Sequence, residues 1–184
     1  MKLSLETAQL LLRPLKLDDA PVISKLTGRR EIADTTISIP HPYSEEQDRE
    51  WISGHLGTKG TSKEVIFAIT LKKNGQLMGS VGLRDIDQDH SRAKTGCWVA
   101  VEEWGKGYAT EASSAALRFG FEELRLNRIY AHHMVRNPAS GHVLENIGMR
   151  REGRLRQPVR KWGVFEDVIL LAILREDWIK ATSS

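Results

Sequence analysis

One stretch near the middle of the chain combines residues suited to holding a phosphorylated ligand. The apolar run Trp98–Val101 is followed by two glutamates and then by Gly105-Lys106-Gly107. This order is typical of a strand that ends, a tight turn and a helix that begins. Backbone N–H groups at such a junction lack partners and lie at the positive end of the helix dipole, so they can bind a diphosphate. The two glycines let phosphates approach the amides, and Lys106 adds a positive charge.

The same pattern also fits a strand-to-helix turn that binds nothing. It is not a Walker A loop, which needs four residues between its glycines and a following Gly-Lys-Ser/Thr. It is not a dinucleotide-binding fingerprint either, because the third glycine is missing and the preceding strand does not open a βαβ series. The spacing of Gly105 and Gly107 therefore leaves a phosphate loop and a plain turn both open.

The segment Trp104–Ala112 resembles the acetyl-coenzyme A loop of the GNAT N-acetyltransferases, in the form found in their RimJ/RimL-like branch. The general pattern of the family is Arg/Gln-x-x-Gly-x-Gly/Ala. Its three fixed places fall on Trp104, Gly107 and Ala109, and Trp104 departs from the consensus Arg or Gln. The residues Leu11–Leu15 are similar to the opening strand of the family. Residues 137–149 are similar to the segment beside the thioester end of the cofactor, so the resemblance covers nearly the whole chain.

The resemblance implies an acetyl-CoA-dependent N-acetyltransferase that transfers acetyl directly to a primary amine, with a protein N-terminal α-amine as one expected acceptor. It also implies an α/β (α+β) fold, in which a splayed, mixed and mostly antiparallel central sheet is flanked by helices. We expect one such domain over residues 1–184, with acetyl-CoA as co-substrate and no metal. Two alternatives remain: a small-molecule amine acetyltransferase, and a non-catalytic sensor that binds acyl-CoA.

Site residues follow from the same resemblance. The pantetheine arm is expected to pair with the backbone of Val99 and Val101, and the Val99 N–H is expected to face the thioester carbonyl, where it would stabilise developing negative charge. The cofactor-binding residues expected are Val99, Ala100, Val101, Trp104, Gly105, Lys106, Gly107, Tyr108, Ala109, Thr110, Asn137 and Ser140. Asn137 resembles the residue whose amide binds the arm, and Ser140 resembles the catalytic serine near the departing sulfur. From the residues alone, Asn137 also fits a helix cap before Pro138, and Ser140 a polar residue in a first turn.

Several residues are candidates for the general base of this site. RimL-type enzymes carry a glutamate at a place that falls on Val159 here, and the acidic residue that many relatives have near Lys94 is also absent. The remaining candidates are His41, Tyr43, His132, His133, Asp85 and Glu166, and we take His41 and His133 forward as the candidate bases. Successive strand residues point to opposite faces, so only one histidine of the pair 132 and 133 can reach the acceptor. Cys97 has no visible activating partner and is interpreted as a core residue.

The acceptor is expected to lie against the segments 39–43 and 160–166. Tyr43, Trp162 and Phe165 make this wall partly apolar, although core packing explains them equally well. The basic residues of the second segment favour an acidic acceptor, such as an acidic peptide. An α-amine has a pKa near 7.7–8.0, whereas an unperturbed lysine lies at about 10.4, so an α-amine needs less help from a base.

The chain order of predicted elements fits a mixed sheet with helices. Strands are expected at 10–15, 65–71, 77–84, 93–101, 128–135 and on both sides of Trp162-Gly163, the last carrying residues 168–174. Helices are expected from an Asp18 N-cap to Leu26, from a Ser44–Gln47 capping box to His55, over 107–124 and over 138–146. Neither a sandwich nor a bundle has this order.

Composition limits the remaining possibilities. The 184 residues hold 27 Lys and Arg against 24 Asp and Glu, and the net charge of +3 is too small to indicate direct binding of nucleic acid. The single cysteine excludes a disulfide framework and a cysteine zinc cluster. No segment resembles a signal peptide or a membrane span, so we expect a cytoplasmic protein, either a monomer or a homodimer, that does not bind membranes.

Overall fold

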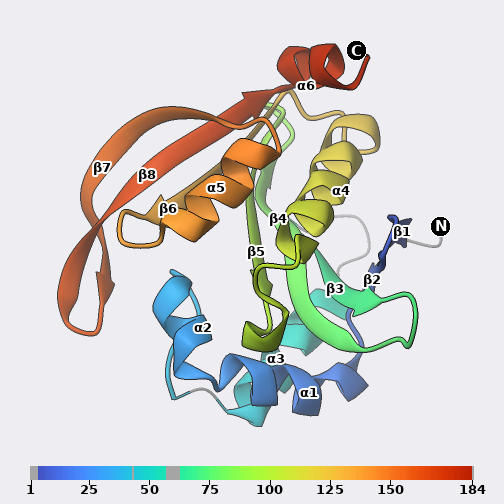
Figure 1. Cartoon of the computed structure of the whole chain (residues 1–184), viewed down its shortest axis with the longest axis vertical. Helices are drawn as coiled ribbons and strands as arrows, with labels where there is room; N and C mark the ends of the chain where they lie inside the picture. The colour runs from blue at the N-terminus through green and yellow to red at the C-terminus, as the bar shows by residue number, and fades with distance from the viewer. Residues whose placement is uncertain (1–3, 43, 57–62, 184) are drawn as a thin grey trace.

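Eight strands form one mixed sheet with helices on both faces in the computed structural model, which describes residues 4–42, 44–56 and 63–183 (Figure 1). The strands are β1 (Leu5–Glu6), β2 (Leu10–Pro14), β3 (Val65–Leu71), β4 (Leu77–Asp87), β5 (Arg92–Val99), β6 (Arg128–Met134), β7 (Arg150–Lys161) and β8 (Val164–Leu174). The α-helices are α1 (Ala20–Thr27), α2 (Arg30–Thr35), α3 (Glu45–Leu56), α4 (Tyr108–Glu122), α5 (Pro138–Asn146) and α6 (Arg175–Thr182); η1 (Leu17–Asp19) and η2 (Val101–Glu103) are 3₁₀ turns. This architecture confirms the fold expected from the sequence.

The order of the strands is β1-β2-β3-β4-β5-β6-β8-β7. Among the strand pairs that the structure describes, β5–β6 is parallel and the others are antiparallel. The helix α4 connects β5 to β6 as a crossover, which a parallel pair requires. The parallel pair lies in the middle of the sheet, where its ends meet helices from both faces.

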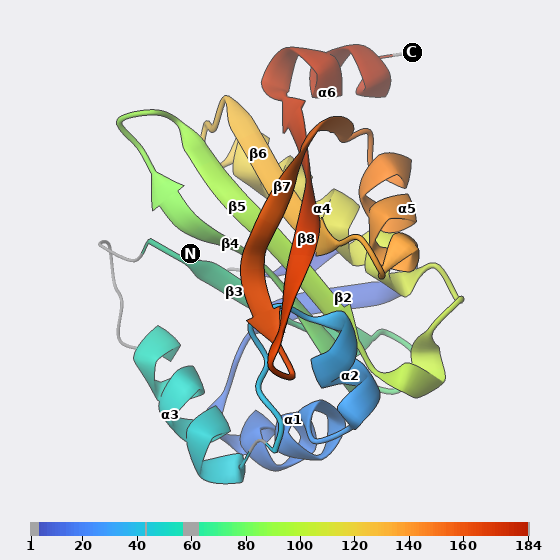
Figure 2. The ribbon, with the colours of Figure 1, turned by 90° about the vertical axis from the view of Figure 1, so that its left-hand side faces the viewer.

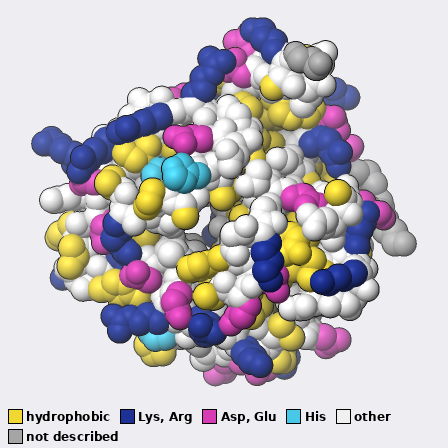
Figure 3. Space-filling model, in the orientation of Figure 1, with side chains coloured by type: hydrophobic (Ala, Val, Ile, Leu, Met, Phe, Trp, Pro, Cys, Tyr) yellow, Lys and Arg dark blue, Asp and Glu magenta, His cyan; other side chains and the backbone are white. Residues whose placement is uncertain are grey.

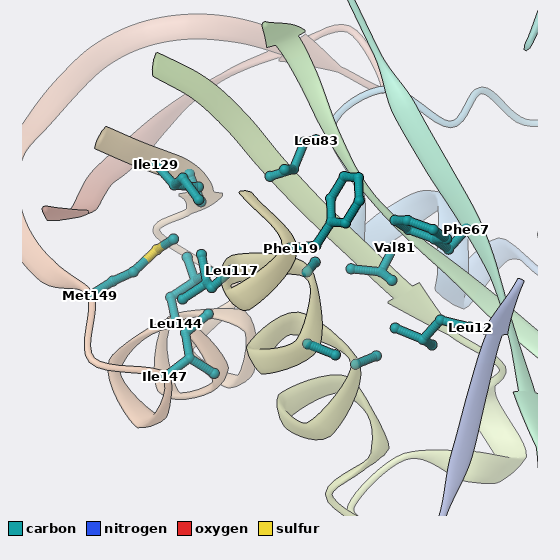
Figure 4. Packing of buried hydrophobic residues seen from close by; sticks show 14 of the residues in the cluster. Leu12, Phe67, Val81, Leu83, Leu117, Phe119, Ile129, Leu144, Ile147 and Met149 are labelled. Atoms are coloured by element: carbon teal, nitrogen blue, oxygen red, sulfur yellow. The ribbon is translucent and has the colours of Figure 1, made fainter. Parts of the chain in front are cut away.

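The larger hydrophobic core lies between the sheet and the helices α4 and α5 (Figure 4). Phe67 of β3 meets Phe119 of α4 edge to face, with ring centroids 5.4 Å apart. Leu117 of α4 and Leu144 of α5 belong to the same cluster, so it holds the two helices together as well as to the sheet. This face of the sheet is therefore closed over most of its area.

The opposite face of the sheet is covered only in part. A smaller cluster, which includes Ile23 of α1 and Ile52 of α3, packs against Ile66 and Ala68 of β3, with Trp98 of β5 at its margin. Figure 2 shows α1, α2 and α3 at one end of this face and the β7–β8 hairpin crossing in front of it. No helix in the described part of the chain is long and apolar enough to cross a membrane.

Several local expectations are confirmed. The capping box at the start of α3 is reciprocal: the Gln47 N–H donates to Ser44 Oγ (3.3 Å) and the Ser44 N–H donates to Gln47 Oε1 (2.9 Å). The helix over 138–146 has the expected bounds. Trp162 and Gly163 both have positive φ (53° and 82°) and join β7 to β8 as a two-residue turn.

Other expectations are wrong in their boundaries. The strand expected over 93–101 ends at Val99, because the chain turns into η2 at Val101. Asp18 is not the N-cap of α1; it lies inside η1, and Asp19 holds the N-cap position. No helix was expected from the sequence at α2 or α6. Each is short, with six and eight residues, and neither shows an extended apolar period.

A partly buried ion pair fixes the entry to α1. Arg13 on β2 binds Asp19 through two hydrogen bonds of 2.7 Å, and the Lys16 N–H donates to Asp19 Oδ2 at 2.8 Å. Burial raises the pKa of the Asp19 carboxyl, but the hydrogen bonds from Arg13 and Lys16 outweigh it, so the pKa lies below its ordinary value. Asp19 thereby joins the first strand of the larger core to the first helix on the other face.

We predict that Asp19→Asn lowers the free energy of unfolding by about 2–3 kcal/mol at pH 7, because Arg13 loses its charged partner in a site shielded from water. The contribution is complete above the unfolded pKa of about 3.9 and is lost as the pH falls through the lower folded pKa. The difference in the free energy of unfolding between the unaltered protein and Asp19→Asn should therefore shrink in acid. Urea titrations at pH 7 and at about pH 3 measure this, with exposed Asp18→Asn as control; an equal effect of both substitutions contradicts the prediction.

Candidate active site

The turn between β5 and α4 presents a row of unpaired backbone amides. The first hydrogen bond of the helix runs from the Glu111 N–H to the Gly107 carbonyl at 3.0 Å. From Gly105 to Thr110, the backbone N–H groups donate to no residue in the parts of the chain that the structure describes. These groups lie at the N-terminus of a helix of 15 residues, whose dipole favours an anion there.

The glycines of this turn are required by its conformation. Gly105 has a φ of 75° and Gly107 a φ of 82°, both in the left-handed region that residues with a side chain rarely adopt. A Cβ built at either position meets no atom within 4 Å, so the space in front of the amides is open. A row of open amides with two glycines among them fits the pyrophosphate of coenzyme A.

Trp104 and Lys106 lie in the same turn but face protein groups. The indole N–H of Trp104 donates to the Val99 carbonyl (2.8 Å), and its backbone N–H donates to the Val101 carbonyl (3.2 Å). The Lys106 ammonium pairs with Glu103 at 2.8 Å. Trp104 therefore closes the turn back onto the end of β5, a structural role that the sequence analysis did not assign to it.

The strands β5 and β6 part where the site begins. They pair only from Arg92↔Arg128 to Lys94↔Tyr130, while β5 stays paired with β4 up to Val99. Figure 3 shows the surface hollowed between α5, β5 and α2, where the two strands separate. The parting creates an opening through the sheet next to the amide turn.

Backbone groups of β5 point into this opening. The Ala100 N–H donates to the Met78 carbonyl of β4 at 2.7 Å, and groups of successive residues in a strand point to alternate sides. The N–H groups of Val99 and Cys97 therefore point away from β4, toward the opening. The orientation of the Val99 N–H is consistent with its expected role. The Cys97 N–H points the same way, although no role was expected for it from the sequence. The expected partner Val101 lies beyond the strand, in η2.

The Cys97 side chain behaves as a core residue. Burial raises the pKa of its thiol to about 12, although a hydrogen bond with Ser113 of α4 opposes the shift. A thiol with so high a pKa is protonated at neutral pH and is a poor nucleophile. This agrees with the interpretation of Cys97 made from the sequence.

The start of α5 brings Asn137 and Ser140 to the other side of the opening. Asn137 caps the helix, because its Oδ1 accepts from the Ser140 N–H at 3.2 Å. Its Nδ2 donates to the Thr35 carbonyl at the end of α2 (2.9 Å), so the same side chain ties α5 to α2. The Ser140 side chain is half-buried, and its hydroxyl has no partner among the residues that the structure describes. The cap confirms one of the two interpretations of Asn137.

Hydrogen bonds and ion pairs hold the tip of the β7–β8 hairpin against α2. Trp162 donates its indole N–H to Asp34 Oδ1 at 2.8 Å, and Arg136 binds both Asp34 (3.1 Å) and Glu166 (2.7 Å). The buried Lys161 donates to the Ile39 carbonyl at 2.6 Å. Burial, and then the charge of Arg136, lower the pKa of Lys161. The segments 39–42 and 160–166, expected around the acceptor, thus lie together at this wall, and Tyr43 lies outside the described residues.

The candidate bases His41 and His133 lie in different environments. His41 is exposed and meets the Trp162 ring edge to face, with centroids 6.0 Å apart. His133 hydrogen-bonds the Met134 carbonyl through Nδ1 at 2.9 Å, and its ring lies against α5 so closely that a Cβ at Gly141 would come within 2.9 Å of it. His133 is therefore enclosed between β6 and α5.

The other candidate general bases lie apart from one another. Asp85 is exposed at an irregularity of β4, and Glu166 is held by Arg136. Glu166 nevertheless lies directly across from Val159, so a carboxylate stands beside the place where the sequence analysis found none. Among the described residues, no three His, Cys, Asp or Glu side chains gather at a metal site.

Comparison with known proteins assigns the family. The model of the acetyltransferase (GNAT) domain matches residues 9–150. The uncharacterized N-acetyltransferase p20 of Bacillus licheniformis is 30% identical over 176 residues, which cover 95% of this chain and 98% of that protein. The Bacillus subtilis protein named "Putative ribosomal N-acetyltransferase YdaF" is 35% identical over 136 residues, covering 74% of this chain and 71% of that protein.

A solved structure agrees with this match. The spermidine N-acetyltransferase of Vibrio cholerae, crystallised with CoA and spermine, superimposes with a TM-score of 0.83 at 30% identity, covering 94% of this chain and 99% of that chain. The amide turn, its two glycines and the parted strands are what such a protein needs to hold coenzyme A. The chain belongs to the GNAT family and is an N-acetyltransferase that uses acetyl-CoA.

Proposed function

We propose that this enzyme acetylates the α-amine of a protein or peptide N-terminus, in the manner that its resemblance to the RimJ/RimL-like branch implies. The observation that carries this proposal is the charge of the acceptor wall, formed by α2 and the tip of the β7–β8 hairpin. The likeness to a protein named as a ribosomal N-acetyltransferase supports it.

The carboxylates of this wall already have arginine partners. Glu31 pairs with Arg29 at 3.0 Å, and Asp34 and Glu166 share Arg136. The hydrogen bond from Trp162, followed by the pairing with Arg136, lowers the pKa of Asp34, so that carboxylate stays ionised and occupied.

Cations remain on the hairpin beside them. Arg160 stacks on Phe165 with its guanidinium carbon 5.5 Å from the ring centroid, and Arg156 is exposed. The wall therefore offers positive charge to an acceptor, and an acceptor with carboxylates near its amine would be attracted to it.

A polyamine is a poor match for the same surface. Spermidine and spermine carry several positive charges, and a site for them needs carboxylates that are free to pair. The structural neighbour from Vibrio cholerae was crystallised with spermine, but here the acidic groups of the wall are committed to Arg29 and Arg136. An α-amine, which is partly neutral near pH 7.5, also suits a site with few acidic groups.

Each part of the site has its own role in the proposed acetyl transfer. The amides of 105–110 bind the pyrophosphate, and the parted edge of β5 aligns the pantetheine arm. The Val99 N–H stabilises the negative charge that develops on the thioester oxygen. The Ser140 hydroxyl donates a hydrogen bond to the departing sulfur, and Asn137 holds the helix that carries Ser140 in place while its amide contacts the arm.

We predict that peptides with Asp or Glu at the second to fourth positions are acetylated at least about tenfold more efficiently than matched peptides with Lys there, because each favourable charge contributes about 1 kcal/mol. Thiol release from acetyl-CoA, with mass spectrometry to locate the acetyl group, measures kcat/KM. Peptides with a blocked N-terminus are the control. A kcat/KM for spermidine above that of every peptide contradicts the proposed acceptor, and the absence of thiol release with every amine tested would favour an acyl-CoA sensor.

We predict that Gly107→Glu weakens coenzyme A binding at least about 100-fold, because a carboxylate would enter the phosphate cradle. Gly75→Glu is the matched control: Gly75 also has a positive φ (72°) with open space around it, but lies in the β3–β4 turn. Both variants should lose a similar 1–2 kcal/mol or so of stability from backbone strain. Calorimetric titration with coenzyme A separates them, and equal affinities would refute the phosphate assignment.

We predict that Ser140→Ala lowers kcat about 10- to 100-fold, the effect of removing one hydrogen bond to a charged group, while the affinity for coenzyme A is largely kept. Ser114→Ala, on the solvent side of α4, is the matched control and should behave as the unaltered enzyme. Single-turnover rates and coenzyme A titrations give the two quantities. A normal kcat in Ser140→Ala would remove Ser140 from the reaction.

A further inference from the structure

The two adjacent histidines of β6 lie on opposite faces of the sheet, and the structure shows which one faces the acceptor. Ile129 and His133 point to the helical face: Ile129 comes close to Gly120 of α4 and His133 to Gly141 of α5. His132 alternates with them and shares the other face with Tyr130, whose ring it meets edge to face at 5.7 Å. That face also carries Trp98, which packs beside α1 and α3.

His132 is the first residue of β6 on this face beyond the point where the strands part. The last pair is Lys94↔Tyr130, and continuing the register by two residues places His132 across from Gly96. Gly96 is exposed, and a Cβ built there meets nothing within 4 Å, so the space beside the imidazole is open. The next residue of β5 is Cys97, whose N–H points into the same opening.

The surroundings of His132 hold few charged groups. Lys94 faces it from β5, and Tyr130 is its neighbour on β6, with Arg128 over the far side of the Tyr130 ring (6.0 Å). Across β8 the opposite residue is Leu170, and beyond it β7 presents Gly153, which has no side chain. The site is therefore apolar on one side, with a single ammonium on the other.

The imidazole is free to accept a proton. Neither ring nitrogen hydrogen-bonds to a residue in the parts of the chain that the structure describes, in contrast to His133, whose Nδ1 is occupied. Burial, and then the charge of Lys94, lower the pKa of His132. The ring is thus neutral at pH 7 and has a lone pair available.

We propose that His132 is the general base of the reaction, the group that takes the proton from the acceptor amine at the mouth between β5 and β6. This assignment rests on the proposed function and replaces His41 and His133 in that role. The amine nitrogen forms its bond to the acetyl carbon, and the bond from that carbon to sulfur breaks. The proton leaves the nitrogen for the His132 ring, and the sulfur departs as a thiolate that is then protonated to the thiol of coenzyme A.

The position also explains why the glutamate of RimL-type enzymes is dispensable here. Val159 on β7 replaces it, and the carboxylate across from it, Glu166, is bound by Arg136 at 2.7 Å. His132 approaches the opening from β6, the strand that forms its edge, and not from the hairpin. His132 thus gives the proton a route on β6 that needs no carboxylate of the hairpin.

The test is the pH dependence of His132→Gln, measured as kcat/KM with an α-amine peptide from about pH 5.5 to about pH 9. We expect kcat near pH 7.5 to fall about 100-fold, with coenzyme A affinity unchanged. The limb of the kcat/KM profile assigned to His132, which lies at lower pH than the limb set by the α-amine at about 7.7–8.0, should disappear. His132→Gly should regain activity when imidazole is added, which a purely structural role would not produce. His90→Gln, an exposed histidine in the β4–β5 turn, is the matched control and should keep the full profile.

The possible outcomes separate this assignment from the proposed function. An active enzyme whose His132→Gln variant keeps its kcat and its acidic limb overturns the role of His132 alone. Loss of that limb in Glu166→Gln, with His132→Gln unaffected, assigns the proton to the hairpin carboxylate instead. An enzyme that turns over no amine overturns the proposed function and the role of His132 with it.

Discussion

The separation of β5 from β6 is the feature on which the rest of the molecule depends. Because the parallel pair stops after Lys94↔Tyr130, the side of β5 that faces away from β4 has no neighbouring strand from Thr95 to Val99, although β4 stays paired along the other side. Unpaired buried backbone groups are costly, and the edge of a sheet readily takes an added strand. An unpaired edge of this kind suits a ligand with amide groups, such as the pantetheine arm of the co-substrate.

The helices on one face hold the two strands apart. α4 begins at the amide turn and packs on β4 and β5, while α5 packs on β6, and Leu117 and Leu144 join the two helices in one core. Gly141 lets α5 approach β6 closely enough to enclose His133. Because packed cores do not deform continuously, the width of the opening is set by these contacts before any ligand arrives.

The acceptor wall depends on contacts between segments that are distant in sequence. Asn137 binds the end of α2 from one side, and Trp162 binds Asp34 from the other, so a helix of six residues is held at both flanks. Arg136 pairs with a carboxylate of α2 and with one of β8. The residues that build this wall thus also determine its charge.

The sequence by itself determined the elements whose signals are local. The Gly105-Lys106-Gly107 turn, the capping box at Ser44 and the proline-led helix at Pro138 each require only neighbouring residues, and their residue types restrict the backbone directly. The resemblance of the loop to GNAT enzymes then supplied the co-substrate and the fold.

Only the tertiary structure decided where those elements lie relative to one another. The helix α2 escaped notice because its stability comes from Asn137 and Trp162, which are more than 100 residues away in the chain. The alternation of a strand shows that His132 and His133 face opposite ways, but not which of them packs against the helices α4 and α5. That choice follows from packing against Gly120 and Gly141, a long-range constraint that no local pattern encodes.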